Sequence, residues 1–319
     1  MKEALLEMLS DGDWHSGEEL ARRLGVSRTA VWKQLHKLDE EGVPVERAHR
    51  QGYRIVGGMD LLDATVIASQ FPASLAASLK LTVLSSVGST NTYLSQQPSG
   101  ATYDVCLAEQ QTAGRGRRGR QWVSPFAQNL YLSLAFNLAG GMSSLDGLSL
   151  VVGVAAADAL AAMGIDGVVL KWPNDLWLER RKLGGVLIEL QGELQTACRV
   201  VMGLGLNVYM EPGNEASIDQ PWTSLKASGL VVDGGRNRLA ATMICALISA
   251  VEAFQQNGFA PWRERWMQRD ALRDQSVYTL PGDLRGVGRG IDAGGAYRIE
   301  TNEGIEVVQS GEISLRMDA

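Results

Sequence analysis

Hydrophobic and polar residues follow three different patterns along the chain, and the pattern changes near residues 60 and 270. The first part places apolar residues at helical spacing in short segments. The middle part has longer apolar runs between polar loops, and the last part has short apolar runs between Gly-rich turns. We therefore expect three domains, over residues 1–60, 61–270 and 271–319, with Gly57-Gly58-Met59-Asp60 as a hinge between the first two.

The first domain has the pattern of two helices joined by a tight turn and followed by a hairpin. Ser16-Gly17-Glu18-Glu19 has the spacing of a capping box, which opens a helix that ends near Leu24. Ser27 then caps a longer helix with apolar residues at helical spacing. Residues 43–48 and 52–56 read as two short strands around a turn. This order of elements predicts a winged helix-turn-helix.

The charges of this domain favour DNA as its partner. Between Leu20 and Leu38 there are five basic residues and no acidic one, although the whole chain has a formal net charge of −6. The residues that we expect to face a DNA groove, at the start of the second helix, are Ser27, Arg28, Thr29 and Lys33. Winged helices also serve as protein-interaction modules, and a basic helix face can simply be solvated. We favour DNA over both alternatives.

The other two domains contain apolar runs that predict strands and helices. The middle domain has candidate strands at residues 82–87, 104–108, 129–136, 168–171, 176–178, 184–190 and 200–208. Its expected helices begin at Ser89-Thr90 and cover residues 148–163 and 239–254. The last domain has candidate strands at residues 276–280, 284–291, 297–301, 304–308 and 312–316, which predict a small β-barrel.

An Arg- and Gly-rich segment, residues 114–120, lies between two predicted strands. Its glycines let the backbone approach a ligand closely, and its arginines offer forked donors that suit carboxylate or phosphate. We therefore expect a loop that binds an anion. The spacing Gly-x-Gly-x-x-Gly also matches the dinucleotide fingerprint, but Pro125 follows and no acidic residue occurs between Glu109 and Asp146. A disordered RNA-binding tail would not be held between two apolar strands.

Several polar residues of the middle domain emerge from apolar surroundings. At Ser89 and Thr90 a hydroxyl can cap a helix or bind a small polar ligand, and both readings stay open. Burial of any such group would demand a hydrogen-bond partner. The other candidates are Lys171, Asn174 and Asp175 around Pro173, Lys182 in a charged turn before Gly184-Gly185, and Asn207 at the end of an apolar run.

Composition restricts the class of protein. The chain has 319 residues, of which 45% are hydrophobic and 21% charged, as in soluble globular proteins. Its negative net charge argues against a general nucleic-acid coat protein. Three isolated cysteines, Cys106, Cys198 and Cys245, favour buried thiols in a reducing cytoplasm and argue against zinc. The acidic residues near Met1 exclude a signal peptide, and the apolar segments 148–163 and 239–251 are interrupted by Asp158 or too short to span a membrane.

Six motifs together resemble those of the bifunctional biotin protein ligases that also repress biotin synthesis in many bacteria. They are Ser89-Thr90-Asn91, Gly114 to Arg120, Lys171-Trp172-Pro173-Asn174-Asp175, Arg181-Lys182-Leu183-Gly184-Gly185, Gly203-Leu204-Gly205-Leu206-Asn207 and Gly311-Glu312-Ile313-Ser314. The resemblance covers the whole chain and is weakest from Tyr209 to Gln220. It implies an α+β fold with an N-terminal winged helix-turn-helix, a central mixed-sheet α/β catalytic domain of the biotin/lipoate ligase type and a C-terminal SH3-like β-barrel.

The resemblance also implies a role for each candidate residue. Biotin would be bound by Ser89, Thr90, Asn91, Gln111, Arg115, Gly116, Arg117 and Lys182. ATP and the adenylate would be bound by Trp122, Lys171, Asn174, Asp175 and Asn207. Lys182, Arg117 and Arg115 would be the catalytic residues.

Cofactors and partners follow from the same resemblance. ATP, biotin and Mg²⁺ are expected, and no residue is identified as a ligand of the metal. The expected partners are the biotin carboxyl carrier protein of acetyl-CoA carboxylase, operator DNA, and a second copy of the chain when the adenylate is bound. No membrane partner is expected.

Two other functions are kept as alternatives. The first is a lipoate-type ligase of related fold, against which the complete Arg/Gly segment and the winged domain argue. The second is a non-catalytic repressor that binds a small anion as its effector, which would bind DNA in a ligand-dependent way without forming AMP.

Overall fold

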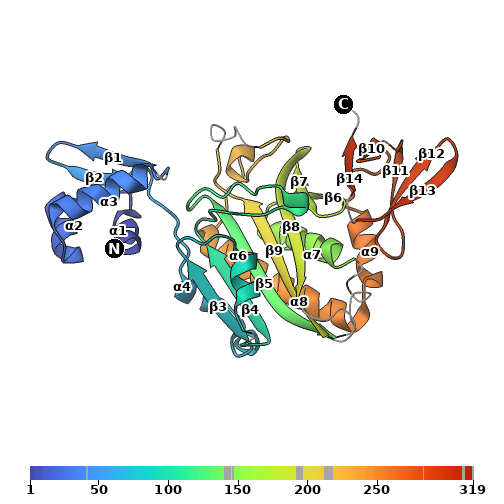
Figure 1. Cartoon of the computed structure of the whole chain (residues 1–319), viewed down its shortest axis with the longest axis horizontal. Helices are drawn as coiled ribbons and strands as arrows, with labels where there is room; N and C mark the ends of the chain where they lie inside the picture. The colour runs from blue at the N-terminus through green and yellow to red at the C-terminus, as the bar shows by residue number, and fades with distance from the viewer. Residues whose placement is uncertain are drawn as a thin grey trace.

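A computed structural model describes residues 1–40, 42–98, 100–139, 145, 147–191, 197–211, 218–282, 284–310 and 313–317. Its strands form three sheets, of two, seven and five strands. In Figure 1 the two-stranded sheet lies at the left, the seven-stranded sheet in the centre and the five-stranded sheet at the right.

The N-terminal part is a winged helix-turn-helix, as predicted. Its elements are α1 Lys2–Leu9, α2 Gly17–Leu24, α3 Arg28–Glu40 and the antiparallel pair β1 Val45–Ala48 and β2 Gly52–Ile55. Both predicted caps form: the Ser16 hydroxyl accepts from the Glu19 amide at 3.0 Å, and the Ser27 hydroxyl accepts from the Ala30 amide at 3.2 Å. Gly25 ends α2 in the left-handed conformation, with φ +65°.

The central sheet is mixed. Its strands are β3 Leu79–Leu84, β4 Tyr103–Ala108, β5 Asn129–Ala139, β6 Val169–Lys171, β7 Asp175–Leu178, β8 Arg181–Gln191 and β9 Ala197–Asn207. They lie in the order β3-β4-β5-β9-β8-β7-β6, and only β3 and β4 are parallel among these neighbours. The parallel pair arises because helix α6, Thr90–Gln96, connects its two strands. Strand β3 lies three residues earlier than predicted, since Leu79 pairs with Tyr103.

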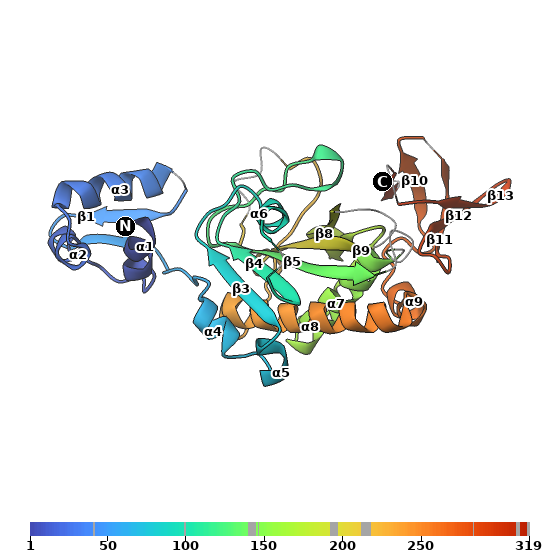
Figure 2. The same ribbon diagram turned by 60° about the horizontal axis from the view of Figure 1, so that its bottom comes forward.

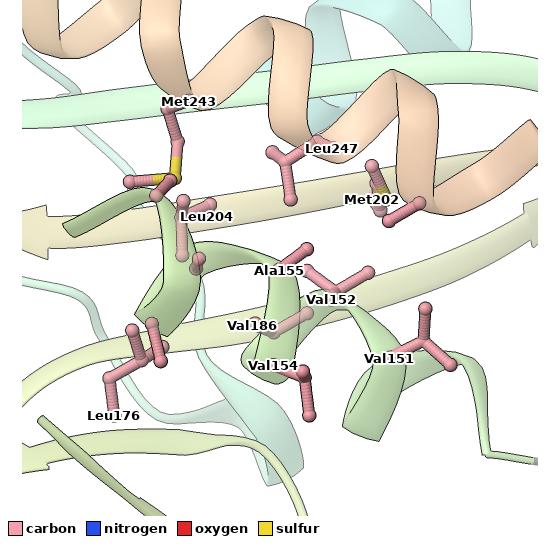
Figure 3. Packing of buried hydrophobic residues seen from close by; sticks show 14 of the residues in the cluster. Val151, Val152, Val154, Ala155, Leu176, Val186, Met202, Leu204, Met243 and Leu247 are labelled. Atoms are coloured by element: carbon pink, nitrogen blue, oxygen red, sulfur yellow. The ribbon is translucent and has the colours of Figure 1, made fainter. Parts of the chain in front are cut away.

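Helices cover both faces of this sheet (Figure 2). Helix α6 lies on one face, and α7 Leu148–Ala162 and α8 Gly235–Asn257 lie on the other. Figure 3 shows Met243 of α8 beside Leu204 of β9, and Val152 of α7 in the same cluster near Val186 of β8. Helix α7 is apolar on nearly all sides, as expected for a helix enclosed by the core. Two short helices, α4 Ala64–Ala68 and α5 Ala73–Ala76, were not predicted.

Helix α8 is longer than the sequence suggested. Within the described residues it is the one helix that is long and apolar enough to cross a membrane, so the prediction that this segment is too short was wrong. Its residues Leu239, Met243 and Leu247 are buried in the core formed with the sheet. Their burial accounts for the apolar composition of α8, which is that of a core helix.

The C-terminal part is an antiparallel sheet of five short strands. They are β10 Ser276–Leu280, β11 Arg285–Ile291, β12 Tyr297–Thr301, β13 Gly304–Val308 and β14 Ser314–Met317, in the order β13-β12-β11-β10-β14. Part of the motif Gly311-Glu312-Ile313-Ser314 lies outside the described residues. Helix α9, Ala260–Met267, connects the central part to this sheet, and Trp266 and Tyr297 join both parts in one hydrophobic core.

Candidate active site and DNA interface

A cavity of about 320 Å³ opens between the start of α6, the Arg/Gly segment, strands β8 and β9, and strand β14. The structure brings every residue predicted to bind biotin or ATP to its wall. These residues are Ser89, Thr90, Asn91, Gln111, Arg115, Gly116, Arg117, Trp122, Lys171, Asn174, Asp175, Lys182 and Asn207. Their location in one cavity is a structural finding, whereas their contacts with a ligand stay predictions.

One side of the cavity carries a network of buried polar groups at the start of α6. Ser89 is the N-cap of α6, and the Thr90 amide and hydroxyl donate to Gln111 Oε1 at 2.9 and 3.1 Å. Ser133 Oγ lies 2.7 Å from Thr90 Oγ1 and 2.6 Å from Asn91 Oδ1. The network fixes these groups before any ligand binds. Sequence reasoning missed Ser133, because a lone serine in an apolar strand gives no indication of its partners.

Two glycines of β9 make room for this arrangement. A Cβ on Gly203 would lie 2.5 Å from Asn91 Oδ1, and a Cβ on Gly205 would lie 2.5 Å from the Trp122 ring. Glycine at both positions therefore lets Asn91 and Trp122 lie directly over the strand. The indole Nε1 of Trp122 is buried and has no hydrogen-bond partner within the described chain, although Trp122 lines the cavity.

The Arg/Gly segment is an ordered loop over the cavity, with a short helical turn, η1 Arg117–Gly119. Arg115 donates to Glu189 at 3.0 Å and to Thr92 at 2.9 Å. Arg117 donates to Asn174 at 3.2 Å and also to the carbonyl of Ser310. The expected anion loop is thus held by the central sheet and by the C-terminal part.

Arg118 makes the second contact between the loop and the C-terminal sheet. It has φ +61°, and its guanidinium donates to the Leu280 carbonyl at 3.2 Å and to Ser314 Oγ at 3.1 Å. Ser314, Leu315 and Arg316 of β14 also line the cavity. This wall was not predicted from the sequence, although Ser314 belongs to one of the six motifs.

Lys182 lies on a strand and not in the charged turn that was predicted. The turn consists of Glu179 and Arg180, which both have positive φ, and β8 begins at Arg181. Lys182 Nζ lies 2.8 Å from Asp175 Oδ1 and 5.3 Å from the centroid of the Trp122 ring. Its amine is therefore held at a fixed position in the cavity wall.

Lys171 is a second, more deeply buried amine in the cavity wall. Its residue is 6% exposed, and Nζ lies 4.4 Å above the ring of Trp177. Burial lowers the pKa of Lys171 to about 8; Asp175 opposes the shift, and Arg316 and Lys182 add to it. Burial also lowers the pKa of Arg117. The cavity thus concentrates positive charge, which an anionic ligand would stabilise.

Asn207 has a protein partner. Its side chain is buried and its Nδ2 donates to the Thr223 carbonyl at 3.0 Å, while its own carbonyl accepts from the Leu225 amide. This contact holds residues 223–225 beside the end of β9. The segment 209–220, where the family resemblance is weakest, contributes Met210, Ile218, Asp219 and Gln220 to the cavity, and residues 212–217 lie outside the described part.

The predicted DNA-facing residues are exposed at the start of α3. Arg28, Thr29 and Lys33 are solvent-accessible, and Ser27 uses its hydroxyl to cap the helix. Two arginines of the hairpin are ion-paired within the domain: Arg47 with Asp39 at 3.3 Å, and Arg54 with Glu46 at 2.7 Å. Arg28 and Lys33 are therefore better candidates for contacts with a nucleic acid than these hairpin arginines.

Comparison with known proteins identifies the family. Residues 83–207 match the model of the biotin/lipoate A/B protein ligase family, and residues 2–54 match an HTH domain. Bifunctional ligase/repressor BirA proteins of Salmonella typhimurium and Escherichia coli are 43% and 42% identical over 98% of this chain and 96% of their own length. The biotin protein ligase of Aquifex aeolicus in complex with biotin and ATP has a TM-score of 0.66 at 28% identity, over 75% of this chain and 99% of that one. This chain belongs to the bifunctional ligase/repressor family of biotin protein ligases.

Proposed function

We propose that this protein activates biotin with ATP, transfers it to a lysine of an acceptor protein, and represses biotin synthesis with the adenylate as its corepressor. The observation that carries the proposal is the set of residues that line the cavity described above. Buried hydrogen-bonding groups at Ser89, Thr90 and Asn91 line it together with the cations Lys171 and Lys182. Such a cavity suits a small polar head group and a phosphate in the same molecule.

The first half-reaction needs charge and orientation more than a protein nucleophile. A carboxylate oxygen of biotin attacks the α-phosphorus of ATP, a new P–O bond forms, and the P–O bond to pyrophosphate breaks. Both reactants are anions, so the transition state needs cations at fixed positions. Lys182 and the loop arginines Arg115 and Arg117 provide them, and the contacts of Lys182 with Asp175 and of Arg117 with Asn174 hold the cations in place.

The second half-reaction transfers the acyl group. A neutral lysine amine of the acceptor attacks the acyl carbon of biotinyl-adenylate, and AMP leaves with the electron pair of the broken C–O bond. The nitrogen releases one proton to solvent as the amide forms. The acceptor that we propose is the biotin carboxyl carrier protein of acetyl-CoA carboxylase. The ordered network at Thr90, Gln111 and Ser133 would keep the biotin ring still while its tail reacts.

Mg²⁺ would enter with the ATP phosphates. The described part of the chain has no group of three or more His, Cys, Asp or Glu side chains that could hold a metal ion by themselves. Mg²⁺ usually needs only one or two carboxylates beside the phosphates, and Asp175 and Asp219 line the cavity. When bound, the ion would neutralise phosphate charge.

The repressor half of the proposal rests on α3. We propose that Ser27, Arg28, Thr29 and Lys33 enter the operator groove, that two adenylate-bound copies bind together, and that the protein works in the cytoplasm. The exposed basic start of α3 supports the DNA contact. Dimerisation is proposed because helix-turn-helix proteins commonly bind two half-sites as two-fold dimers. We also propose the domain division 1–60, 61–270 and 271–319.

ATP–pyrophosphate exchange with the intact protein tests the enzyme activity. We expect exchange that depends on biotin and not on lipoate. Exchange that lipoate supports better would favour a lipoate-type ligase. Absence of exchange, together with DNA binding that a small anion still controls, would favour a non-catalytic repressor.

A further inference from the structure

We propose that Tyr297 and Asp270 are positioning residues for the nucleotide half of the active site, although neither lines the cavity. The proposal rests on the ligase function given above. Tyr297 is fully buried, and its hydroxyl donates to Asp270 Oδ2 at 2.9 Å. This hydrogen bond links the C-terminal sheet to the segment that precedes it, which pairs with Leu170, the residue before Lys171.

Asp270 is attached to the edge strand β6 at the residue before Lys171. The Leu170 amide donates to the Arg269 carbonyl at 2.7 Å, and the Ala271 amide donates to the Leu170 carbonyl at 2.9 Å. These two bonds extend the central sheet by one short parallel bridge. Any shift of Asp270 would therefore shift the backbone that carries Lys171.

Tyr297 contacts the residue on the other side of Lys171. Its ring lies 5.8 Å from the ring of Trp172, centroid to centroid, and Trp266 packs on it edge-on at 6.4 Å. The Trp172 indole donates to the Gly295 carbonyl at 3.0 Å. Both neighbours of Lys171 are thus held from outside β6: Leu170 by the segment that precedes the C-terminal sheet, and Trp172 by Gly295 and Tyr297 of that sheet's β11–β12 connection and β12.

The same hydrogen bond also acts on the part of the cavity wall that β14 provides. Tyr297 lies on β12, which is joined through β11 and β10 to β14, the strand that brings Leu315 and Arg316 to the cavity. The fit is close, because a Cβ on Gly288 of β11 would lie 2.7 Å from the Tyr297 hydroxyl and 2.2 Å from the Leu272 carbonyl. Tyr297 and Asp270 therefore set the distance between Lys171 and Arg316.

The biotin half of the cavity does not depend on this contact. Its polar network consists of Ser89, Thr90, Asn91, Gln111 and Ser133, which all belong to the central part of the chain. A positioning role for Tyr297 consequently predicts a selective effect: weaker binding of the nucleotide, with unchanged binding of biotin alone.

The test compares Tyr297→Phe with Tyr103→Phe in the full chain. Tyr103 is a matched control, because it is also buried and donates to a carboxylate, Glu252 Oε1 at 3.1 Å, but does not line the cavity. Calorimetry would measure the Kd of biotin alone and the Kd of a non-hydrolysable α,β-methylene ATP in the presence of biotin. For Tyr297→Phe we expect the nucleotide to bind roughly three- to tenfold more weakly, because the variant loses one hydrogen bond to a carboxylate that acts on the site indirectly. The Kd of biotin should stay within about twofold of the wild-type value. Tyr103→Phe should change neither Kd.

Two results would overturn the positioning role. One is an unchanged nucleotide Kd in Tyr297→Phe, and the other is a parallel loss of biotin and nucleotide binding, which a general structural defect would cause. If Tyr297→Phe does not fold, Asp270→Asn replaces it, because an amide can still hydrogen-bond to the Tyr297 hydroxyl; the same selective loss, smaller in size, is expected. The two binding measurements need no turnover, so they test the positioning role alone. Absence of biotin-dependent exchange in the wild-type protein would instead refute the ligase function.

Discussion

Lys182 and Asp175 form an ion pair of 2.8 Å across the β7–β8 hairpin, inside the cavity. Gly185, opposite Asp175 in the hairpin, makes space for the pair: a Cβ there would lie 3.3 Å from both Asp175 Oδ1 and Lys182 Cε. Without a ligand the aspartate therefore holds the amine in place. An incoming carboxylate or phosphate would compete with Asp175 for Lys182. The amine could then exchange its partner, from Asp175 to the reacting anion, without a large movement of the side chain.

Replacing Lys182 should remove activation while leaving the fold intact. For Lys182→Ala we expect biotin-dependent ATP–pyrophosphate exchange to fall roughly 100- to 1000-fold, the usual effect of removing one group that stabilises a developing anion. Lys226→Ala is the control, because Lys226 forms an exposed ion pair with Glu211. Exchange at the wild-type rate in Lys182→Ala, with a circular dichroism spectrum that shows a folded protein, would contradict the role given to this amine.

Charge reversal at the start of α3 should separate DNA binding from catalysis. Arg28→Glu and Lys33→Glu each replace an exposed cation by an anion. We expect at least a tenfold loss of affinity for the promoter DNA of the biotin synthesis genes, and a smaller dependence of that affinity on salt, because fewer counterions are released. Electrophoretic mobility shift and pyrophosphate exchange would be measured on the same preparations.

The control for this pair is Lys80→Glu, the same change of charge at an exposed position on the central sheet. It should bind DNA like wild type apart from a small effect of net charge. If Arg28→Glu lost exchange activity as well as DNA binding, the two functions would not be separable in the way that the fold suggests.

Local patterns in the sequence were enough to predict most of the fold. The caps at Ser16 and Ser27 depend on residues three positions away. The two long helices of the core, α7 and α8, coincide with apolar runs that are too long for a typical strand. Most of the predicted cavity residues could be found in the same way, because they belong to local motifs, whereas Gln111 and Trp122 were named only through the family resemblance. Only the family resemblance divided them between biotin and nucleotide.

Contacts between distant parts of the chain could not be predicted. Nothing near Arg118 in the sequence points to Ser314, and nothing near Tyr297 points to Asp270 or Trp172. Lys182 was placed in a turn because four charged residues in a row resemble one, whereas pairing between β7 and β8 decides where the strand begins. Such pairings depend on packing across the whole fold and leave no local pattern.

Arg236 is the clearest example of a residue that sequence reasoning missed, and its removal should destabilise the protein strongly. It is fully buried, lies 2.7 Å from Glu109 Oε2, and donates to the carbonyls of Asp60 at 2.9 Å and Asn129 at 3.0 Å. For Arg236→Met we expect a loss of about 3–5 kcal/mol in the free energy of unfolding, because the Glu109 carboxylate stays buried without its partner. Urea unfolding followed by circular dichroism would measure this loss.

A neighbouring arginine serves as the control for this ion pair. Arg238 pairs with Asp233 on the surface, so Arg238→Met should cost about 1 kcal/mol or less. The double variant Arg236→Met with Glu109→Gln should lose less unfolding free energy than the two single variants lose together, since no charge is left unpaired. Additive losses would show that the two side chains do not stabilise each other.

Nucleotide binding should weaken at alkaline pH because of Lys171. Burial lowers the pKa of this amine to about 8, so it is mostly charged at pH 7.5 and mostly neutral at pH 9.5 in the ligand-free protein. Only the charged form attracts phosphate strongly. If this amine dominates the change and stays charged in the complex, the protonated fractions of the free protein at the two pH values predict a roughly 25-fold loss of affinity for ATP between them. Calorimetric titration with α,β-methylene ATP in the presence of biotin would measure the loss, since the phosphates keep nearly the same charge over this range.

Lys171→Met tests whether this amine is the group responsible. Methionine keeps an unbranched apolar chain in the buried position but carries no charge at any pH. We expect the variant to bind the nucleotide weakly at pH 7.5 and to lose little further affinity at pH 9.5, so that it and the wild type converge as Lys171 becomes neutral. An equally steep loss in Lys171→Met would assign the pH dependence to another group. A wild-type affinity that is constant from pH 7.5 to 9.5 would contradict the role given to Lys171. Any preference of the bound phosphates for the charged amine must appear as a loss of affinity above the ligand-free pKa of about 8. In that case Lys171→Met should bind the nucleotide like the wild type at pH 7.5.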